Sequence, residues 1–107
     1  MNDRAPALQA EKLDRAAAVL NALYNPARLR IVNLLEDGAW NSVQQIYTTL
    51  GLDPSQTSQH LTRLRRAGLV ETQRAGKTVN YRIVRERYGA ATGAISEFLE
   101  DAVGLTA

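Results

Sequence analysis

The sequence predicts a mainly α-helical fold with one small β-hairpin, built from about five helices in a single domain over residues 1–107. Apolar residues recur at helical spacing in separate stretches of the chain, and helix start and stop signals stand between those stretches. Two short segments late in the chain flank a glycine, which favours a hairpin. With 107 residues the chain can bury one modest core.

The first two helices are expected over residues 8–23 and from Pro26 onward, and residues 1–7 are expected to be loose. Asn25 caps the second helix, and proline suits its first position because the missing N–H would have no partner there. Asp37-Gly38 ends this helix. The apolar positions of the first helix are Leu13, Ala16, Ala17, Leu20 and Leu23.

The third and fourth helices follow a short connection. Asn41 or Ser42 caps a short third helix, and Gly51 stops it. The fourth helix, residues 54–67, has the clearest start signal in the chain, because Asp53 caps it and a proline takes its first position. Its expected inner face consists of Thr57, Leu61 and Leu64.

The remainder of the chain predicts a hairpin and a last helix. Residues 69–73 and 78–83 read as two short strands around a glycine-containing link at residues 74–77. A final helix is expected over residues 86–104, with an apolar stripe along one side. This order of elements is that of a winged helix-turn-helix, in which the fourth helix reads DNA and the hairpin forms a two-stranded wing.

The positive charge of the chain is concentrated in one segment. The whole chain has 13 Lys and Arg against 11 Asp and Glu, a net charge of +2. Residues 63–87 hold eight of the basic residues and two of the acidic ones, net +6. Residues 1–62 hold five and six, net −1, and residues 88–107 hold none and three, net −3. A local positive field attracts polyanions, and this one coincides with the helix-and-hairpin unit rather than with an arbitrary solvated surface.

The outer side of the fourth helix carries residue types that read DNA. A major groove accommodates one α-helix, and its base edges are read by short polar side chains and arginines. The tip of the hairpin, residues 73–78, carries cations around a glycine, which suits phosphate or minor-groove contact. We therefore expect DNA contacts from Ser55, Gln56, Ser58, Gln59, His60, Thr62, Arg63, Arg66, Arg74, Lys77 and Arg82.

Three segments resemble the ArsR-type family of dimeric repressors. Residues 25–35 look like the family's second-helix signature, residues 55–70 are similar to its recognition-helix signature, and residues 74–82 resemble its wing. The three segments stand in the family's order and spacing, within a resemblance that covers residues 15–85. The matching positions of the recognition helix include Ser58, His60, Leu61, Leu64, Ala67, Gly68 and Leu69.

This resemblance implies a homodimer, joined by its first and last helices, that represses by binding an inverted-repeat operator near a promoter. Both terminal helices carry apolar stripes, and the alternative is that these stripes complete the core of a monomer. Dimerisation is the preferred interpretation, because two half-sites are how one short reading helix gains adequate affinity. The expected dimer contacts are Leu13, Ala16, Leu20, Ile95, Phe98 and Leu99.

The chain departs from the metal-sensing members of this family. Those members place two cysteines around a valine in the third helix, where this chain has Ser42 and Gln44 around Val43 and no cysteine anywhere. Other members bind zinc through Asp and His of their last helices, and this last helix has no histidine. We therefore expect no metal site, no cofactor and no response to thiolate-binding metals. Solvated surface is the preferred interpretation of its carboxylates, Glu97, Glu100 and Asp101.

Several polar residues have a structural alternative to DNA contact. His60 either contacts DNA or packs against a neighbouring helix. Arg28 and Arg30 either touch phosphate or form salt bridges with an acid such as Glu36 or Asp37. Packing roles are expected for Trp40 and Tyr81.

The preferred function is a sequence-specific DNA-binding transcriptional regulator, with double-stranded DNA and a second copy of the chain as partners. The alternative is a winged-helix module that binds a partner protein, but such a module does not need basic residues gathered on one edge. No enzyme is expected, because one histidine and no cysteine leave no nucleophile–base pair, and no phosphate-cradling glycine loop is present. No feature of the sequence identifies an effector.

The chain is expected to stay in the cytoplasm and to have no membrane partner. Its longest apolar run, residues 16–20, is far shorter than a transmembrane span. Residues 1–6 lack the charged-then-apolar pattern of a signal peptide.

Overall fold

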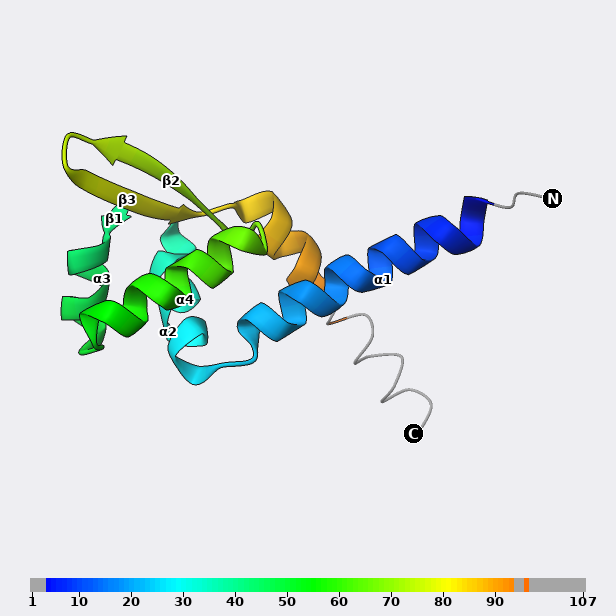
Figure 1. Ribbon diagram of the computed structural model, residues 1–107, viewed down its shortest axis with the longest axis horizontal. Coiled ribbons are helices and arrows are strands. Elements are labelled where there is room, and N and C mark those ends of the chain that lie inside the picture. The colour runs from blue at the N-terminus through cyan, green and yellow to red at the C-terminus, as the bar shows by residue number, and fades with distance from the viewer. Residues whose placement is uncertain (1–3, 94–95, 97–107) are drawn as a thin grey trace.

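A computed structural model of the chain describes residues 4–93 and residue 96, and it confirms the predicted winged helix-turn-helix (Figure 1). A helix over residues 85–93 follows the wing. The preceding elements are α1 (Arg4–Leu23), α2 (Pro26–Leu34), the short 3₁₀ helix η1 (Leu35–Asp37), β1 (Asn41–Ser42), α3 (Val43–Leu50), α4 (Pro54–Arg66), β2 (Val70–Ala75) and β3 (Thr78–Ile83).

Capping residues begin the helices where the sequence predicts. Asn25 Oδ1 accepts hydrogen bonds from two backbone N–H groups in the first turn of α2. Asp53 Oδ2 accepts from the Gln56 backbone N–H in the first turn of α4. At α3 the cap is Ser42, which forms a reciprocal pair of hydrogen bonds with Gln45. Each cap satisfies backbone donors that the start of a helix leaves free.

Two boundaries differ from the prediction by more than one residue. α1 begins at Arg4, so residues 4–7, which were expected to be loose, are helical. The hairpin link is shorter than expected, because β2 continues through Ala75 and only two residues connect it to β3. The first of these is Gly76, whose φ of 64° lies in the left-handed region that two-residue hairpin links use.

A third strand, which the sequence analysis misses, joins the hairpin to the helix-turn-helix. β1 pairs with β3, with Asn41 opposite Tyr81 and Ser42 opposite Asn80, and the sheet order is β1-β3-β2. Because Ser42 is also the N-cap of α3, the same residue ends β1 and begins a helix. The base of the wing is thereby attached to the helix that packs against α4.

One apolar core holds α4 in place. α1, α2, α3 and β2 all pack against this helix. Tyr81 packs against the core from the sheet, as predicted, and Trp40 is half-buried. Within the described part of the chain, the largest fully buried side chains are Ile31, Val32, Leu35, Ile46, Thr57, Leu61, Leu64 and Leu69.

Candidate nucleic-acid interface

The buried face of α4 determines which residues it presents outward. Thr57, Leu61 and Leu64 have no exposed surface, as the sequence predicts for the inner face. These positions recur every three or four residues, so they turn one side of the helix into the core. The residues of α4 that are exposed after its first proline are Ser55, Gln56, Ser58, Gln59, Thr62, Arg63, Arg65 and Arg66.

Every exposed residue in that set is polar or cationic, and none is apolar. The Thr62 hydroxyl donates to the Ser58 carbonyl at 3.0 Å, so it can offer only its acceptor to a partner. The Gln59 side chain makes no hydrogen bond within the described part of the chain, which leaves its amide free to donate and to accept. Such a surface can hydrogen-bond base edges and attract phosphates at the same time.

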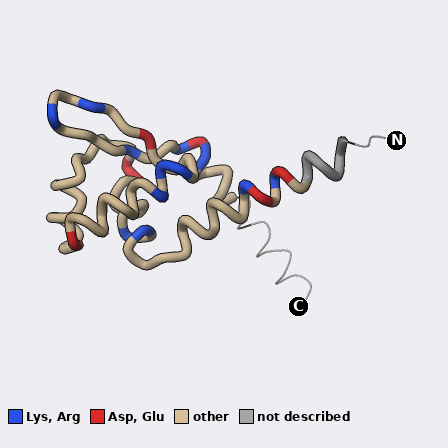
Figure 2. The backbone as a smooth tube through the Cα atoms, viewed as in Figure 1, with Lys and Arg blue, Asp and Glu red and all other residues tan. Residues whose placement is uncertain are grey.

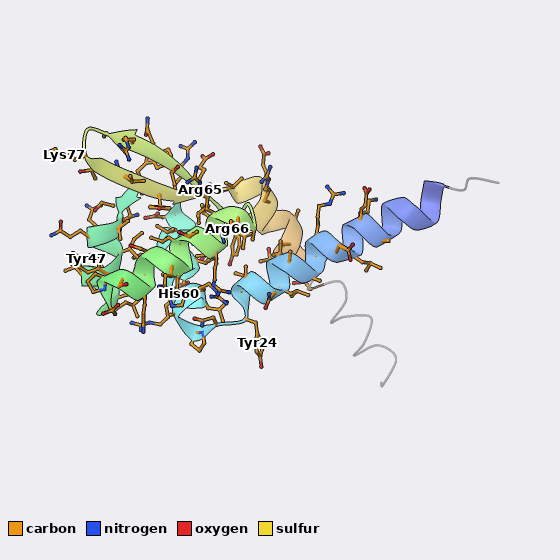
Figure 3. All side chains as sticks on the ribbon, in the orientation of Figure 1. Tyr24, Tyr47, His60, Arg65, Arg66 and Lys77 are labelled. Carbon is orange, nitrogen blue, oxygen red and sulfur yellow. The ribbon has the colours of Figure 1, made fainter. Side chains whose placement is uncertain are left out.

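Five exposed cations surround this face. Arg63, Arg65 and Arg66 occupy the last turn of α4, and Arg74 and Lys77 lie on the wing. Figure 2 shows Lys and Arg at the end of α4 and around the hairpin, and Figure 3 labels Arg65, Arg66 and Lys77. The sequence analysis assigned no role to Arg65, although its place among the basic residues of the fourth helix was a sufficient signal.

Three other cations of the basic segment are held by the protein itself. The Arg82 guanidinium pairs with Glu71 on the neighbouring strand and lies 4.4 Å from the centre of the Trp40 ring. Arg85 Nη2 donates to the Asp37 carbonyl at 2.9 Å. Arg87 packs against Gly68, where an added Cβ would collide with the Arg87 guanidinium. Fewer cations are therefore free to contact a polyanion than the net charge of residues 63–87 suggests.

The salt bridges considered for two arginines of α2 do not form. Arg30 Nη2 donates to the Leu50 carbonyl at 2.7 Å, and Arg28 reaches backbone carbonyls at the end of α1. Within residues 4–93 and 96 the one side-chain ion pair is that of Arg82 with Glu71. Both arginines of α2 instead satisfy carbonyls at helix ends, where a cation is favourable.

His60 lies on α4 but faces the protein interior rather than the exposed side. Its Nδ1 is 3.4 Å from Arg28 Nη1, and the side chain is half-buried where α4 meets α2 (Figure 3). Burial lowers the pKa of His60, and the positive charges of Arg28 and Arg63 lower it further. The packing alternative is therefore the one that this geometry favours.

The expected dimer contacts of α1 are exposed apolar side chains. Leu13 is 63% exposed and Leu20 47% exposed, and Ala16 between them is exposed as well. Figure 1 shows the first part of α1 extending away from the other described elements. An open apolar hollow of about 300 Å³ lies beside the end of the helix, lined by Leu20, Leu23, Tyr24, Leu29, Tyr88 and Thr92. The other expected contacts, Ile95, Phe98 and Leu99, are outside the described residues.

The two positions that match metal-binding cysteines have other surroundings here. Ser42 is engaged as the cap of α3, and Gln44 is an exposed residue of its first turn. Within the described part of the chain, no group of three or more His, Asp or Glu residues is placed to hold a metal. None of the described helices is long and apolar enough to cross a membrane.

The family model described as "Bacterial regulatory protein, arsR family" matches residues 25–72. This range begins at the cap of α2 and ends within β2, so it contains both helices of the helix-turn-helix. It also contains most of the residues expected to read DNA.

Known proteins extend the similarity over most of the chain. The HTH-type transcriptional regulator YgaV of Escherichia coli (strain K12) is 38% identical over 77 residues, which cover 72% of this chain and 78% of that protein. The NMR structure of the homodimeric winged helix-turn-helix DNA-binding domain (fragment 1–100) of Mb0332 from Mycobacterium bovis has a TM-score of 0.73 and 31% identity, with 96% and 91% of the two chains covered. The crystal structure of NolR from Sinorhizobium fredii has a TM-score of 0.71 and 34% identity over 92% and 96%. The chain therefore belongs to the arsR family of bacterial regulatory proteins, and it is a transcriptional regulator with a winged helix-turn-helix DNA-binding fold.

Proposed function

We propose that the protein is a homodimeric repressor that binds an inverted-repeat operator, with α4 of each protomer in a major groove and the wing against the DNA backbone. The observation that carries this proposal is the outer face of α4, whose exposed residues after the first proline are all polar or cationic. Solvent alone makes an exposed helix face polar, but this helix also has three arginines in its last turn and no acidic residue, which suits a polyanion.

Base reading is assigned to the first half of α4. Ser55, Ser58 and Gln59 lie three and four residues apart, so they share one face of the helix. Arg63 follows four residues after Gln59 and can reach a base or a phosphate at the edge of the groove. The first residues of the recognition helix are the ones that approach base edges in helix-turn-helix proteins.

Attraction to the backbone is assigned to the exposed cations. Arg65 and Arg66 at the end of α4 and Arg74 and Lys77 on the wing can meet phosphates without reading sequence. Arg82, expected from the sequence to contact DNA, is given a different role. Its ion pair with Glu71 ties β3 to β2, and its guanidinium lies over the Trp40 ring.

The dimer is proposed on the exposed apolar surface of α1 and the hollow beside it. Leu13 and Leu20 are 63% and 47% exposed on a helix that projects from the core, which favours a second copy as their cover. The related Mb0332 domain is described as homodimeric, which supports the same arrangement. A two-fold axis would place the two α4 helices about 34–36 Å apart, one turn of duplex.

Repression is the proposed outcome, because a dimer seated over a promoter obstructs transcription. Control by soft metals is not proposed, since the chain has no thiolate to bind them. Control through an organic ligand, a partner protein or the amount of the regulator itself fits the residues present.

Selection of bound sites from genomic DNA fragments tests the proposal. We expect an inverted repeat with half-sites one turn apart, and an affinity for it that falls steeply as salt is added, because phosphate contacts release counterions. A promoter fused to that site should be less active when the protein is present. Fragments that share no sequence, together with an affinity that does not depend on salt, would contradict the proposal and favour a protein-binding module.

A further inference from the structure

A buried arginine without an acidic partner lies where α1, α2 and α4 meet. Arg28 of α2 is 8% exposed, and no carboxylate of the described residues pairs with it. Burying an unpaired charge is strongly unfavourable unless its hydrogen-bonding groups are satisfied. The partners that satisfy this guanidinium therefore indicate what it does.

Two of its nitrogens cap the end of α1. Arg28 Nε donates to the Ala22 carbonyl, and Nη2 lies 3.4 Å from the Asn21 carbonyl as a donor. The last carbonyls of a helix lack partners within the helix and carry partial negative charge, which a cation stabilises. The last turn of α1 contains no basic residue of its own, so α2 supplies the cation.

The third nitrogen faces α4. Arg28 Nη1 lies 3.4 Å from His60 Nδ1, and an arginine can only donate. His60 closes this contact when it is neutral with its proton on Nε2, because Nδ1 then accepts. Protonation would place an N–H and a positive charge on the nitrogen that faces the guanidinium.

The charges near His60 all oppose its protonation. Arg28 reaches it from α2 and Arg63 from α4, and both lower its pKa. α1, which also packs against α4, has no ionisable side chain between Arg15 and its end at Leu23. The remaining ionisable residues on described elements packed against α4 are Arg4, Glu11, Lys12, Asp14 and Arg15 earlier on α1, Arg30 on α2, Tyr47 on α3, and Glu71 and Arg74 on β2.

We propose that Arg28 and His60 form a bracket that fixes the recognition helix α4 relative to α1, and that this bracket holds only while His60 is neutral. The inference rests on the proposed function, in which α1 lies at the dimer interface and α4 reads DNA. In such a dimer the bracket sets the placement of each recognition helix relative to the two-fold axis. Operator affinity therefore decreases as His60 becomes protonated.

The composition of the chain makes this testable by pH. With one histidine and no cysteine, His60 is the only side chain whose ordinary pKa lies between about 5 and 8. Operator affinity is measured from pH 7.5 to 5.5 at constant salt. Sedimentation at pH 7.5 and at pH 5.5 determines whether the protein is dimeric. We expect the affinity to fall toward pH 5.5 while the protein stays dimeric, because operator binding and proton release are linked, and the fall should be centred below the ordinary histidine pKa, because burial and the neighbouring arginines lower the pKa of His60.

Three variants assign the effect. His60→Gln keeps a hydrogen-bond acceptor but cannot titrate, so its affinity should vary little with pH. Arg30→Met is the matched control on the same helix, since Arg30 donates to the Leu50 carbonyl instead, and it should retain the pH profile of the unchanged protein. Arg28→Met removes the nearby positive charge, so the midpoint of the His60 titration, followed by NMR in the free protein, should rise. If Arg28→Met does not fold, Arg28→Lys takes its place. Lysine keeps the positive charge but lacks the planar guanidinium that donates to several acceptors, so this variant should weaken operator binding at pH 7.5.

The outcomes separate the bracket from the proposed function. An affinity that rises as the pH falls would mean that protonated His60 contacts DNA, and it would overturn the bracket. A flat profile for the unchanged protein, or loss of the dimer at pH 5.5, would overturn it as well. Absence of operator binding at pH 7.5 would contradict the proposed function. The bracket would then be tested in the free protein alone, by the NMR titration of His60 and by whether Nδ1 of the neutral His60 is unprotonated.

Discussion

Two kinds of side chain share the proposed contact with DNA. Gln59 on α4 carries a donor and an acceptor in one plane, a combination that can pair with a base edge in the major groove. Lys77 in the link between the wing strands carries a mobile point charge that can meet any phosphate. Both residues are exposed, so replacing either one leaves the core intact.

Single substitutions should therefore separate specificity from attraction. Gln59→Ala should cost roughly 1–3 kcal/mol in binding to the operator and far less in binding to random DNA. Lys77→Ala should weaken binding to both DNAs alike and reduce the salt slope by about one unit. Titration of both variants against both DNAs at several salt concentrations measures these effects. If Gln59→Ala lowers the two affinities equally, base reading does not belong to this face of α4.

At this scale the sequence predicts residue types better than it predicts their partners. The faces of α4 follow from helical spacing, and Thr57 and Leu61 lie inside as expected. The partners of Arg82 and His60 depend on residues far away in the chain, on a neighbouring strand and on α2. No local pattern distinguishes a basic residue held by such a partner from one that is free.

The helices are defined by their caps. α4 begins where Asp53 accepts the Gln56 N–H, and its first residues are the ones assigned to base reading. Loss of the cap leaves backbone donors in the first turn without a partner. The start of the reading helix would then fray.

Asp53→Ala should lower the free energy of unfolding by about 1 kcal/mol. Urea unfolding measures this as a lower midpoint with an unchanged slope. Asp53→Asn is the matched control, because an asparagine side chain can accept the same hydrogen bond and should retain most of the stability. Equal midpoints for the alanine variant and the unchanged protein would show that the cap contributes little here.

Elements with local signals were predictable, and those formed by distant pairing were not. The caps at Asn25, Ser42 and Asp53 act within three residues of sequence, so they can be read directly. β1 is two residues long and exists because it pairs with β3, about forty positions later. The sequence therefore predicted the hairpin of β2 and β3, but it did not predict β1 as a third strand of the sheet.

At the scale of the whole molecule, the absence of cysteine limits how DNA binding can be regulated. A thiolate is the ligand that soft metals select and the group that mild oxidants attack. We expect zinc, cadmium, arsenite and mild oxidants to leave operator affinity unchanged in direct binding measurements. A stoichiometric metal in the purified protein, whose removal by a chelator changes the affinity by about tenfold or more, would refute this expectation on the usual scale of coupling between sites.

The proposed dimer depends on a helix that contributes little to the core of its own protomer. Among residues 10–23 of α1, Leu13 and Ala16 are exposed, and the buried residues are Ala22 and Leu23 at its end. Residues 13, 16, 17 and 20 repeat at spacings of three and four, so they form one stripe on the helix. Charges placed in that stripe should oppose association while leaving the core of the protomer unchanged.

The double variant Leu13→Glu/Leu20→Glu should accordingly be monomeric at micromolar concentration while retaining its helical circular dichroism. Burying two carboxylates in an apolar interface without partners is strongly unfavourable, whereas both positions are exposed in the protomer. Ala18→Glu is the matched control, because Ala18 is exposed on a different side of α1, and this variant should remain dimeric. Sedimentation gives the mass of each protein, and titration with a full operator and with a half-site gives the consequence for binding. The monomer should bind the two DNAs with similar, weak affinity, since one short helix reads one half-site. A monomeric unchanged protein, or a double variant that still sediments as a dimer, would show that α1 does not form the interface.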